Sequence, residues 1–141
     1  HLIFNMVTFW FFAFPLERQI GSLRFAVLYF AALAVSDLGT YLKHRNDPQY
    51  ASLGASGAIS AVLFAAIVYF PWMKLFIIPI PLPIPAPLFA VGYVAYSWYS
   101  ARQARGRINH DAHLGGALFG LLFVLVTDPS AFGQLLRWAG G

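Results

Sequence analysis

Five long stretches without Asp, Glu, Lys or Arg constrain the fold of this chain more than any other feature. They cover residues 3–16, 25–36, 49–73, 75–101 and 114–127. A helix crosses the hydrocarbon core of a bilayer with about 20 apolar residues, within a range of about 17 to 25. Two of the runs reach that length, and the other three reach it with flanking polar residues or as shortened helices inside a bundle. The runs therefore predict helices packed within a membrane.

The composition agrees with this interpretation. Hydrophobic residues make up 60% of the chain and charged residues only 10%, whereas soluble domains carry roughly 25% charged residues. Polar and apolar residues do not alternate, which excludes an outer-membrane barrel. We therefore expect an all-α, polytopic transmembrane helical bundle of about five helices, forming a single domain over residues 1–141. Because the chain begins at His1 with apolar residues following at once, we expect a segment of a longer protein, truncated at its N-terminus.

Charge and cysteine content exclude several function classes. The chain has no cysteine, which removes disulfides, thiol catalysis and thiolate metal sites. Its net charge of +4 comes from nine basic residues scattered among short connectors, and these form no stripe for nucleic acid. They fit anchoring at a lipid interface instead. We expect the lipid bilayer as a partner, no nucleic acid, no cofactor and no metal.

The predicted helices cover residues 1–14, 23–42, 56–71, 87–100 and 111–127. The charged connector 16–24 reads as an interfacial loop, in which Gly21 permits a sharp reversal. Alternate prolines between residues 79 and 87 exclude a helix and predict an extended loop at the interface. Near the end of the fourth helix, an aromatic cluster predicts a membrane-interface belt: Tyr93, Tyr96, Trp98 and Tyr99. The C-terminal tail is amphipathic.

The segment Gly54-Ala55-Ser56-Gly57 places a lone hydroxyl at the start of the third helix. Backbone N–H groups in a first helical turn lack intrahelical partners and lie at the positive end of the helix dipole, so they can stabilise developing negative charge. Small residues of this kind also line ordinary helix contacts in membranes. The segment alone therefore leaves a nucleophile and a packing contact both open.

Helix alternation brings further polar residues to this serine. With five helices, the starts of the first, third and fifth lie on one side, together with His1, Asn5, Ser56 and His113. On the fifth helix, the next small residues on the face of His113 are Gly116 and Gly120, whose spacing lets a neighbouring helix approach closely. If that neighbour is the third helix, His113 reaches the hydroxyl of Ser56.

These residues can form a hydrolytic site. Imidazole is suited to taking the proton of a serine hydroxyl near neutral pH, and His1 and Asn5 would act beside the Ser56 N–H as donors to an oxyanion. The alternatives are an interfacial histidine at 113 and an asparagine that only bonds another helix. An ionisable side chain inside a membrane helix favours a functional role.

The combination of motifs resembles the rhomboid family of intramembrane serine proteases. The resemblance rests on four segments in family order: His1-Leu2-Ile3-Phe4-Asn5, the connector from Leu16-Glu17-Arg18 to Gly21, Gly54-Ala55-Ser56-Gly57, and Ala112-His113-Leu114-Gly115-Gly116 with Gly120. It implies a dyad of Ser56 as nucleophile and His113 as general base, with an oxyanion hole formed by His1, Asn5 and the Ser56 N–H. It also implies that the first family helix is missing from this chain.

The resemblance further implies the setting of the reaction. The substrates would be single-pass or other transmembrane proteins, admitted sideways past the fourth helix, which resembles the gating helix of the family. The active site would face the side opposite the cytoplasm, although the count of basic residues is five to four against that orientation. Family members often carry an aromatic residue four positions after the serine, where this chain has Ser60, and Phe14-Pro15 stands where small residues are common.

Several other functions are weighed against this one. The first is a non-proteolytic rhomboid-like scaffold that binds membrane clients, and the second is a transporter, for which no inverted repeat is visible. A metal site of His110, His113 and His1 lacks a carboxylate-rich ligand set, and the hydrolase nucleophile elbow lacks its last glycine and its strand. Asp111 lies nearly opposite His113 on the helix and is excluded as a triad acid, while Asp37 is expected to cap or pair structurally.

Overall fold

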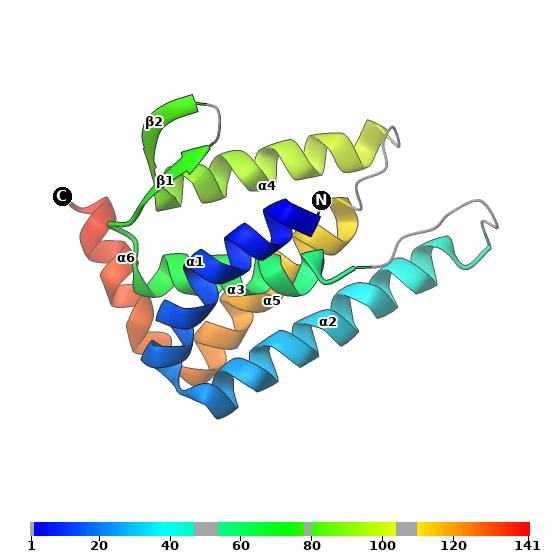
Figure 1. The fold of residues 1–141 in the computed structure, drawn as a ribbon, viewed down its shortest axis with the longest axis horizontal. Helices are drawn as coiled ribbons and strands as arrows, with labels where there is room; N and C mark the ends of the chain where they lie inside the picture. The colour runs from blue at the N-terminus through cyan, green and yellow to red at the C-terminus, as the bar shows by residue number, and fades with distance from the viewer. Residues whose placement is uncertain (1, 47–53, 78–79, 104–109) are drawn as a thin grey trace.

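The computed structural model describes residues 2–46, 54–77, 80–103 and 110–141, which form a helical bundle with one small hairpin (Figure 1). The fold class predicted from the apolar runs is confirmed. The elements in chain order are α1 (Leu2–Ile20), α2 (Ser22–His44), α3 (Ser56–Tyr69), β1 (Lys74–Ile77), β2 (Ile80–Pro85), α4 (Ala86–Gln103), α5 (His110–Thr127), the 3₁₀ turn η1 (Pro129–Ala131) and α6 (Phe132–Ala139).

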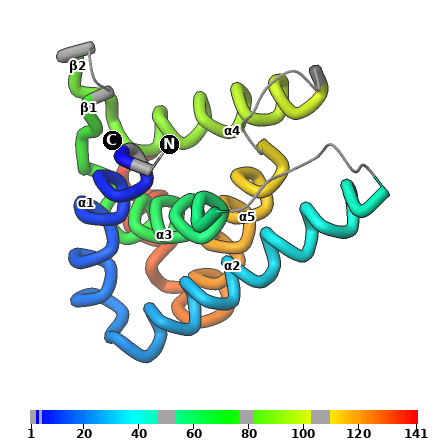
Figure 2. The backbone as a smooth tube through the Cα atoms, turned by 45° about the vertical axis from the view of Figure 1, so that its right-hand side comes forward, coloured from blue at the N-terminus to red at the C-terminus, as the bar shows by residue number. Residues whose placement is uncertain are grey.

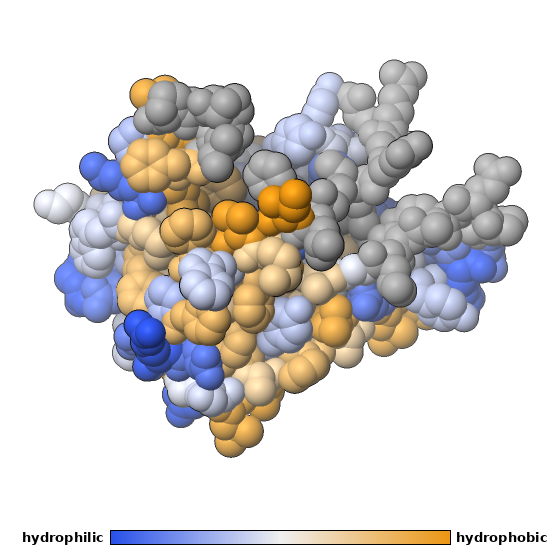
Figure 3. Space-filling model, viewed as in Figure 1, coloured by the Kyte–Doolittle hydropathy of each residue, from blue (hydrophilic) through white to orange (hydrophobic). Residues whose placement is uncertain are grey.

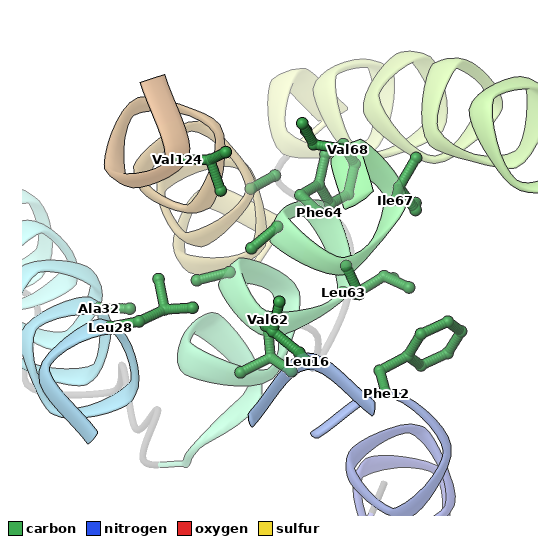
Figure 4. Packing of buried hydrophobic residues seen from close by; sticks show 14 of the residues in the cluster. Phe12, Leu16, Leu28, Ala32, Val62, Leu63, Phe64, Ile67, Val68 and Val124 are labelled. Atoms are coloured by element: carbon green, nitrogen blue, oxygen red, sulfur yellow. The ribbon is translucent and has the colours of Figure 1, made fainter. Parts of the chain in front are cut away.

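Helix α3 lies at the centre of the bundle. Every residue from Gly57 to Val68 is buried, which is typical of a helix that is apolar on all sides. Figure 2 shows α3 nearly end-on, with α1, α2, α4 and α5 around it. Phe12 and Leu16 of α1 pack against it from one side, and the buried core also contains Leu28 of α2 and Val124 of α5 (Figure 4). The core is therefore built around a single helix of 14 residues.

The outer surface carries many large apolar side chains, among them Trp10, Phe30, Val91 and Val126. Hydrophilic residues gather at the left and right edges of the face in Figure 3, and mostly apolar residues cover the area between them. By length and composition, α2 and α5 could each cross a membrane, whereas α3 is apolar but shorter. A continuous exposed apolar belt between polar edges is the surface expected of a protein surrounded by lipid.

The first connector differs from the prediction. Helix α1 continues through Pro15 to Ile20, and Gly21, at a φ of 86°, is the one residue between α1 and α2. The predicted reversal at Gly21 is present, but the predicted interfacial loop over residues 16–24 is wrong. The helix persists past the proline because Leu16 is fully buried in the core, and this burial outweighs the loss of one backbone hydrogen bond.

The proline-rich stretch is extended, as predicted, and is also paired. Strands β1 and β2 form an antiparallel hairpin in which Phe76 lies opposite Pro83 and Leu75 opposite Ile84. Prolines at alternate positions leave the N–H groups of the residues between them free for pairing, as an edge strand requires.

Helix α4 crosses over the bundle along the upper edge of Figure 1. Tyr96, Trp98 and Tyr99 are exposed, in keeping with the predicted belt, and the Arg102 guanidinium lies 3.9 Å from the centre of the Trp98 ring. Tyr93 differs from the prediction, because it packs inward against the core.

Candidate active site

The site is organised by a backbone contact between α3 and α5. A Cβ added to Gly116 would overlap the carbonyl group of Gly57, and one added to Gly120 would overlap the carbonyl of Ala61. Two glycines four residues apart on α5 therefore let the backbones of α3 and α5 approach more closely than any larger residue would allow. This is the contact that the spacing of Gly116 and Gly120 predicts.

Helix α2 also packs against α3 at Gly57. A Cβ on Gly57 would overlap the side chain of Ser36 on α2 and would lie 3.1 Å from the carbonyl oxygen of Ala112 on α5. Ser56 directly precedes Gly57, and His113 directly follows Ala112. Ser56 is thus next to the tightest α3–α5 contact, and His113 is next to the residue of α5 whose carbonyl oxygen faces Gly57. Both are half-buried, whereas Gly57 and Ala112 are buried.

The ring of His113 is held by an aromatic side chain from α4. Tyr93 stacks on it with 6.0 Å between ring centroids and 26° between the ring planes. The Tyr93 hydroxyl is hydrogen-bonded to Ser60 Oγ at 2.8 Å. Ser60 is four residues after Ser56, so both serines share one face of α3. Tyr93 therefore links His113 to the face of α3 that carries Ser60 and Ser56.

Sequence reasoning missed this use of Tyr93. It identified Ser60 as a departure at the position where an aromatic residue is common and placed Tyr93 in the interfacial belt. In the structure, the aromatic ring that stacks on His113 is Tyr93 of α4. Ser60 is hydrogen-bonded to the Tyr93 hydroxyl, with either group as the donor. Only the tertiary packing of α4 on α3 links the two positions.

His110 lies beside His113, but the described residues provide no further metal ligands around this pair. The two rings are 6.0 Å apart at their centroids, and the His110 ring also meets Tyr96 edge-on at 5.5 Å. The His110 side chain is 8% exposed, and its Nδ1 has no hydrogen-bond partner within the described part of the chain. No group of three His, Cys, Asp or Glu residues suited to a metal occurs in residues 2–46, 54–77, 80–103 and 110–141. His1, the third residue of the metal alternative, lies outside these ranges.

The acidic residues Asp111 and Asp37 differ in their contacts. Asp111 forms an ion pair with Lys43 of α2 at 2.7 Å and lies 3.8 Å from His44 Nε2, so its carboxylate joins the end of α2 to the start of α5. This agrees with its exclusion as a triad acid. Asp37 is exposed on α2 and makes no hydrogen bond or ion pair with any described residue, so none of them provides the predicted structural cap or pair.

Of the two side chains predicted to donate hydrogen bonds to an oxyanion, the structure describes only Asn5. Asn5 lies in the first turn of α1 and is half-buried, while His1 lies outside the described residues. At the start of α3 the N-cap residue is Ala55, whose side chain makes no capping hydrogen bond. The first-turn N–H groups are thus not occupied by a side-chain cap, as an anion site at a helix N-terminus requires. A Cβ on Gly54 would meet nothing within 4 Å, so Gly54 is not part of the helix contact.

Known proteins that match this chain belong to one family. The family described as Rhomboid domain matches residues 1–129. The presenilin-associated rhomboid-like protein, mitochondrial, of Homo sapiens is 33% identical over 98% of this chain and 35% of its own length. Rhomboid protein 1, mitochondrial, of Saccharomyces cerevisiae is 32% identical over 87% of this chain and 36% of its own length.

A bacterial relative matches a shorter part. The putative rhomboid protease YdcA of Bacillus subtilis is 41% identical over 42% of this chain and 29% of its own length. The chain thus spans about a third of the length of the curated relatives it matches. No solved structure matches it.

Proposed function

Because this chain belongs to the rhomboid family of membrane proteins, we propose that it carries the active site of an intramembrane serine endopeptidase. Ser56 is the nucleophile and His113 the general base of a catalytic dyad. The observation that supports the proposal is the α3–α5 contact, in which a Cβ on Gly116 would overlap the carbonyl of Gly57. Ser56 directly precedes Gly57, and His113 lies three residues before Gly116 on the same helix.

In this mechanism the imidazole of His113 takes the proton of the Ser56 hydroxyl as its oxygen attacks the peptide carbonyl. The carbonyl oxygen gains a negative charge, which the Ser56 N–H, Asn5 and His1 stabilise as hydrogen-bond donors. The imidazolium then gives its proton to the leaving amine, and an acyl-enzyme remains on Ser56. A water molecule, deprotonated by His113, hydrolyses that ester and restores the free serine.

The contacts of His113 support its role as a base. Tyr93 fixes the imidazole plane from one side, and Asp111 is engaged by Lys43 instead of by His113. A dyad therefore fits these contacts better than a triad. No cofactor and no metal is needed for any step.

The setting follows from the apolar surface. We propose an integral, multi-pass membrane protein whose residues 1–141 act as a single domain, with the active site facing the side opposite the cytoplasm. Its substrates are transmembrane segments of single-pass or other membrane proteins, which reach Ser56 sideways, past α4, in a locally unwound form. Helix α4 is suited to this role because half of its described side chains are exposed, whereas α3 is enclosed.

The test is cleavage of a transmembrane peptide by the purified full-length protein in detergent or lipid. We expect cleavage by the wild type, its loss in Ser56→Ala, and its retention in Ser52→Ala, which removes a serine of the preceding segment. A wild-type protein that binds the peptide without cutting it, and a Ser56→Ala variant that binds it equally, would favour the non-proteolytic rhomboid-like scaffold instead.

A further inference from the structure

Helix α4 is held less tightly to the bundle than the other long helices. An apolar groove of about 560 Å³, open to the surface, runs along it, lined from α3 by Phe64 and Val68 and from α4 by Val91 and Val94. Where such a space separates two helices, dispersion contacts between them are lost. By contrast, α3 and α5 touch through their backbones. Helix α4 is therefore the element most free to move relative to α3.

One polar contact joins α4 to α3. The bond between the Tyr93 hydroxyl and Ser60 Oγ, at 2.8 Å, is the one side-chain hydrogen bond between these two helices in the part of the chain that the structure describes. The Tyr93 ring also packs against Phe64, with centroids 5.6 Å apart, and against Phe89 at 5.9 Å. Tyr93 thus fastens α4 at the level of Ser60, one turn from Ser56.

The same ring contacts the proposed base. His113 is stacked on Tyr93 at 6.0 Å, and His110 touches the imidazole edge-on. A histidine ring turns readily about its side-chain torsions unless its neighbours restrict it. On the side of α4, Tyr93 provides that restriction, and it can do so only while α4 is seated.

We propose that Tyr93 is a positioning residue that couples His113 to the place of α4. With α4 seated, the Tyr93–Ser60 bond holds the tyrosine ring against the imidazole and restricts the orientation of the base. When α4 moves outward to admit a substrate, the ring leaves His113 and the base loses its fixed orientation. Bond cleavage then follows the return of α4, so substrate admission and chemistry alternate. This inference rests on the proposed protease function and adds to it the regulation of the same site.

The experiment compares three variants of the full-length protein with a matched control. Tyr93→Ala removes the ring, Tyr93→Phe keeps the ring and removes the hydroxyl, and Ser60→Ala removes the hydroxyl's partner. The control is Tyr99→Ala, which makes the same change on α4 at an exposed residue. Two readouts are measured: the rate of labelling by a small fluorophosphonate, which needs the dyad but no displaced α4, and kcat and KM for a transmembrane peptide.

We expect Tyr93→Ala to lower the labelling rate and kcat by about 10-fold to 10²-fold, since misplacing a catalytic group by about 1 Å has effects of that size. KM should not rise. Tyr93→Phe should restore most of the lost rate, leaving a deficit of up to about fivefold, the equivalent of one hydrogen bond. Ser60→Ala should match Tyr93→Phe, and the double variant should be no worse than either single variant, because both remove the same bond.

Separate outcomes would contradict the positioning role of Tyr93, the role of ring stacking, and the proposed protease function. If Tyr93→Ala labels at the rate of Tyr99→Ala while the wild type is active, Tyr93 does not position the base. If Tyr93→Phe is as slow as Tyr93→Ala, or if Tyr93→Ala changes KM alone, ring stacking is not the cause. A wild type that neither labels nor cleaves would overturn the proposed function, and the inference with it.

Discussion

Replacing Gly116 by alanine would disturb the contact on which the dyad geometry depends. The added Cβ would lie 2.7 Å from the carbonyl carbon of Gly57 and closer still to its oxygen. Carbon atoms in contact are normally 3.5 to 4.0 Å apart, so α5 must move away from α3 by about 1 Å. The obstacle is backbone on both sides, and no side-chain rotation relieves it.

The size of the effect follows from that displacement. Overpacking of a close contact costs about 1–3 kcal/mol of stability, and a shift of about 1 Å between catalytic groups costs about 10²-fold in rate. We therefore expect Gly116→Ala to lower fluorophosphonate labelling about 10²-fold and to lower the thermal unfolding midpoint. The matched control is Gly115→Ala, whose Cβ would meet nothing within 4 Å.

The assay is labelling and thermal unfolding of both variants in the same detergent. Gly115→Ala should label like the wild type. If Gly116→Ala folds, labels and unfolds like Gly115→Ala, then the α3–α5 contact does not set the position of His113, and the argument from helix spacing is refuted.

Further predictions concern the oxyanion, substrate access and the opposite end of the bundle. Asn5→Ala should lower kcat by up to about 10²-fold to 10³-fold with KM nearly unchanged, and an effect on KM alone would make Asn5 a structural residue. Phe89→Ala, which removes a partly buried ring of α4, should ease substrate entry and lower KM for a transmembrane peptide roughly fivefold, the effect of losing one aromatic pair. It should not raise kcat, because the same ring packs against Tyr93, and Leu88→Ala, at a side chain 58% exposed, should change KM less. Hydrogen bonds, the strongest from Ser130, hold the pKa of Asp128 below its usual value, so its contribution to stability is present above about pH 3.9 and is lost as pH falls through the lowered pKa. The loss of thermal stability caused by Asp128→Asn should therefore be smaller at pH 3 than at pH 6.

The helices and the α3–α5 contact could be predicted because they depend on local patterns. Charge-free runs mark the helices, and the start of α3 at Ser56 agrees with the change from polar to apolar sequence. The spacing of Gly116 and Gly120 predicts a close neighbour for α5, and helix alternation makes α3 one of the helices that start on the same side. These inferences need only helix geometry and the thickness of a bilayer.

The end of α1 could not be predicted from its composition. Glu17, Arg18 and Gln19 resemble a polar connector, and Pro15 normally ends a helix. The helix continues because Leu16 is buried between its neighbours, and burial depends on residues far away in the chain. Gly21 was correctly identified, since a positive φ is a property of the single residue.

The surroundings of His113 could not be predicted for a similar reason. Tyr93 and Ser60 are 33 residues apart, and their hydrogen bond depends on how α4 crosses α3. Nothing in the periodicity of α4 distinguishes Tyr93 from Tyr96 or Tyr99, which are exposed. For Asp37, an acidic residue beside an apolar run indicates a partner, and the described residues do not contain it.

The central claim is that His113 activates Ser56, and covalent labelling by a fluorophosphonate tests it most directly. The probe needs both an activated hydroxyl and a site for its phosphoryl oxygen. We expect the folded full-length protein to be labelled on Ser56, with a rate that declines as the pH falls and His113 becomes protonated, because only neutral imidazole accepts a proton. Labelling should vanish in Ser56→Ala and fall about 10²-fold to 10⁴-fold in His113→Ala. Absence of labelling near neutral pH, or equal labelling without His113, would contradict the dyad.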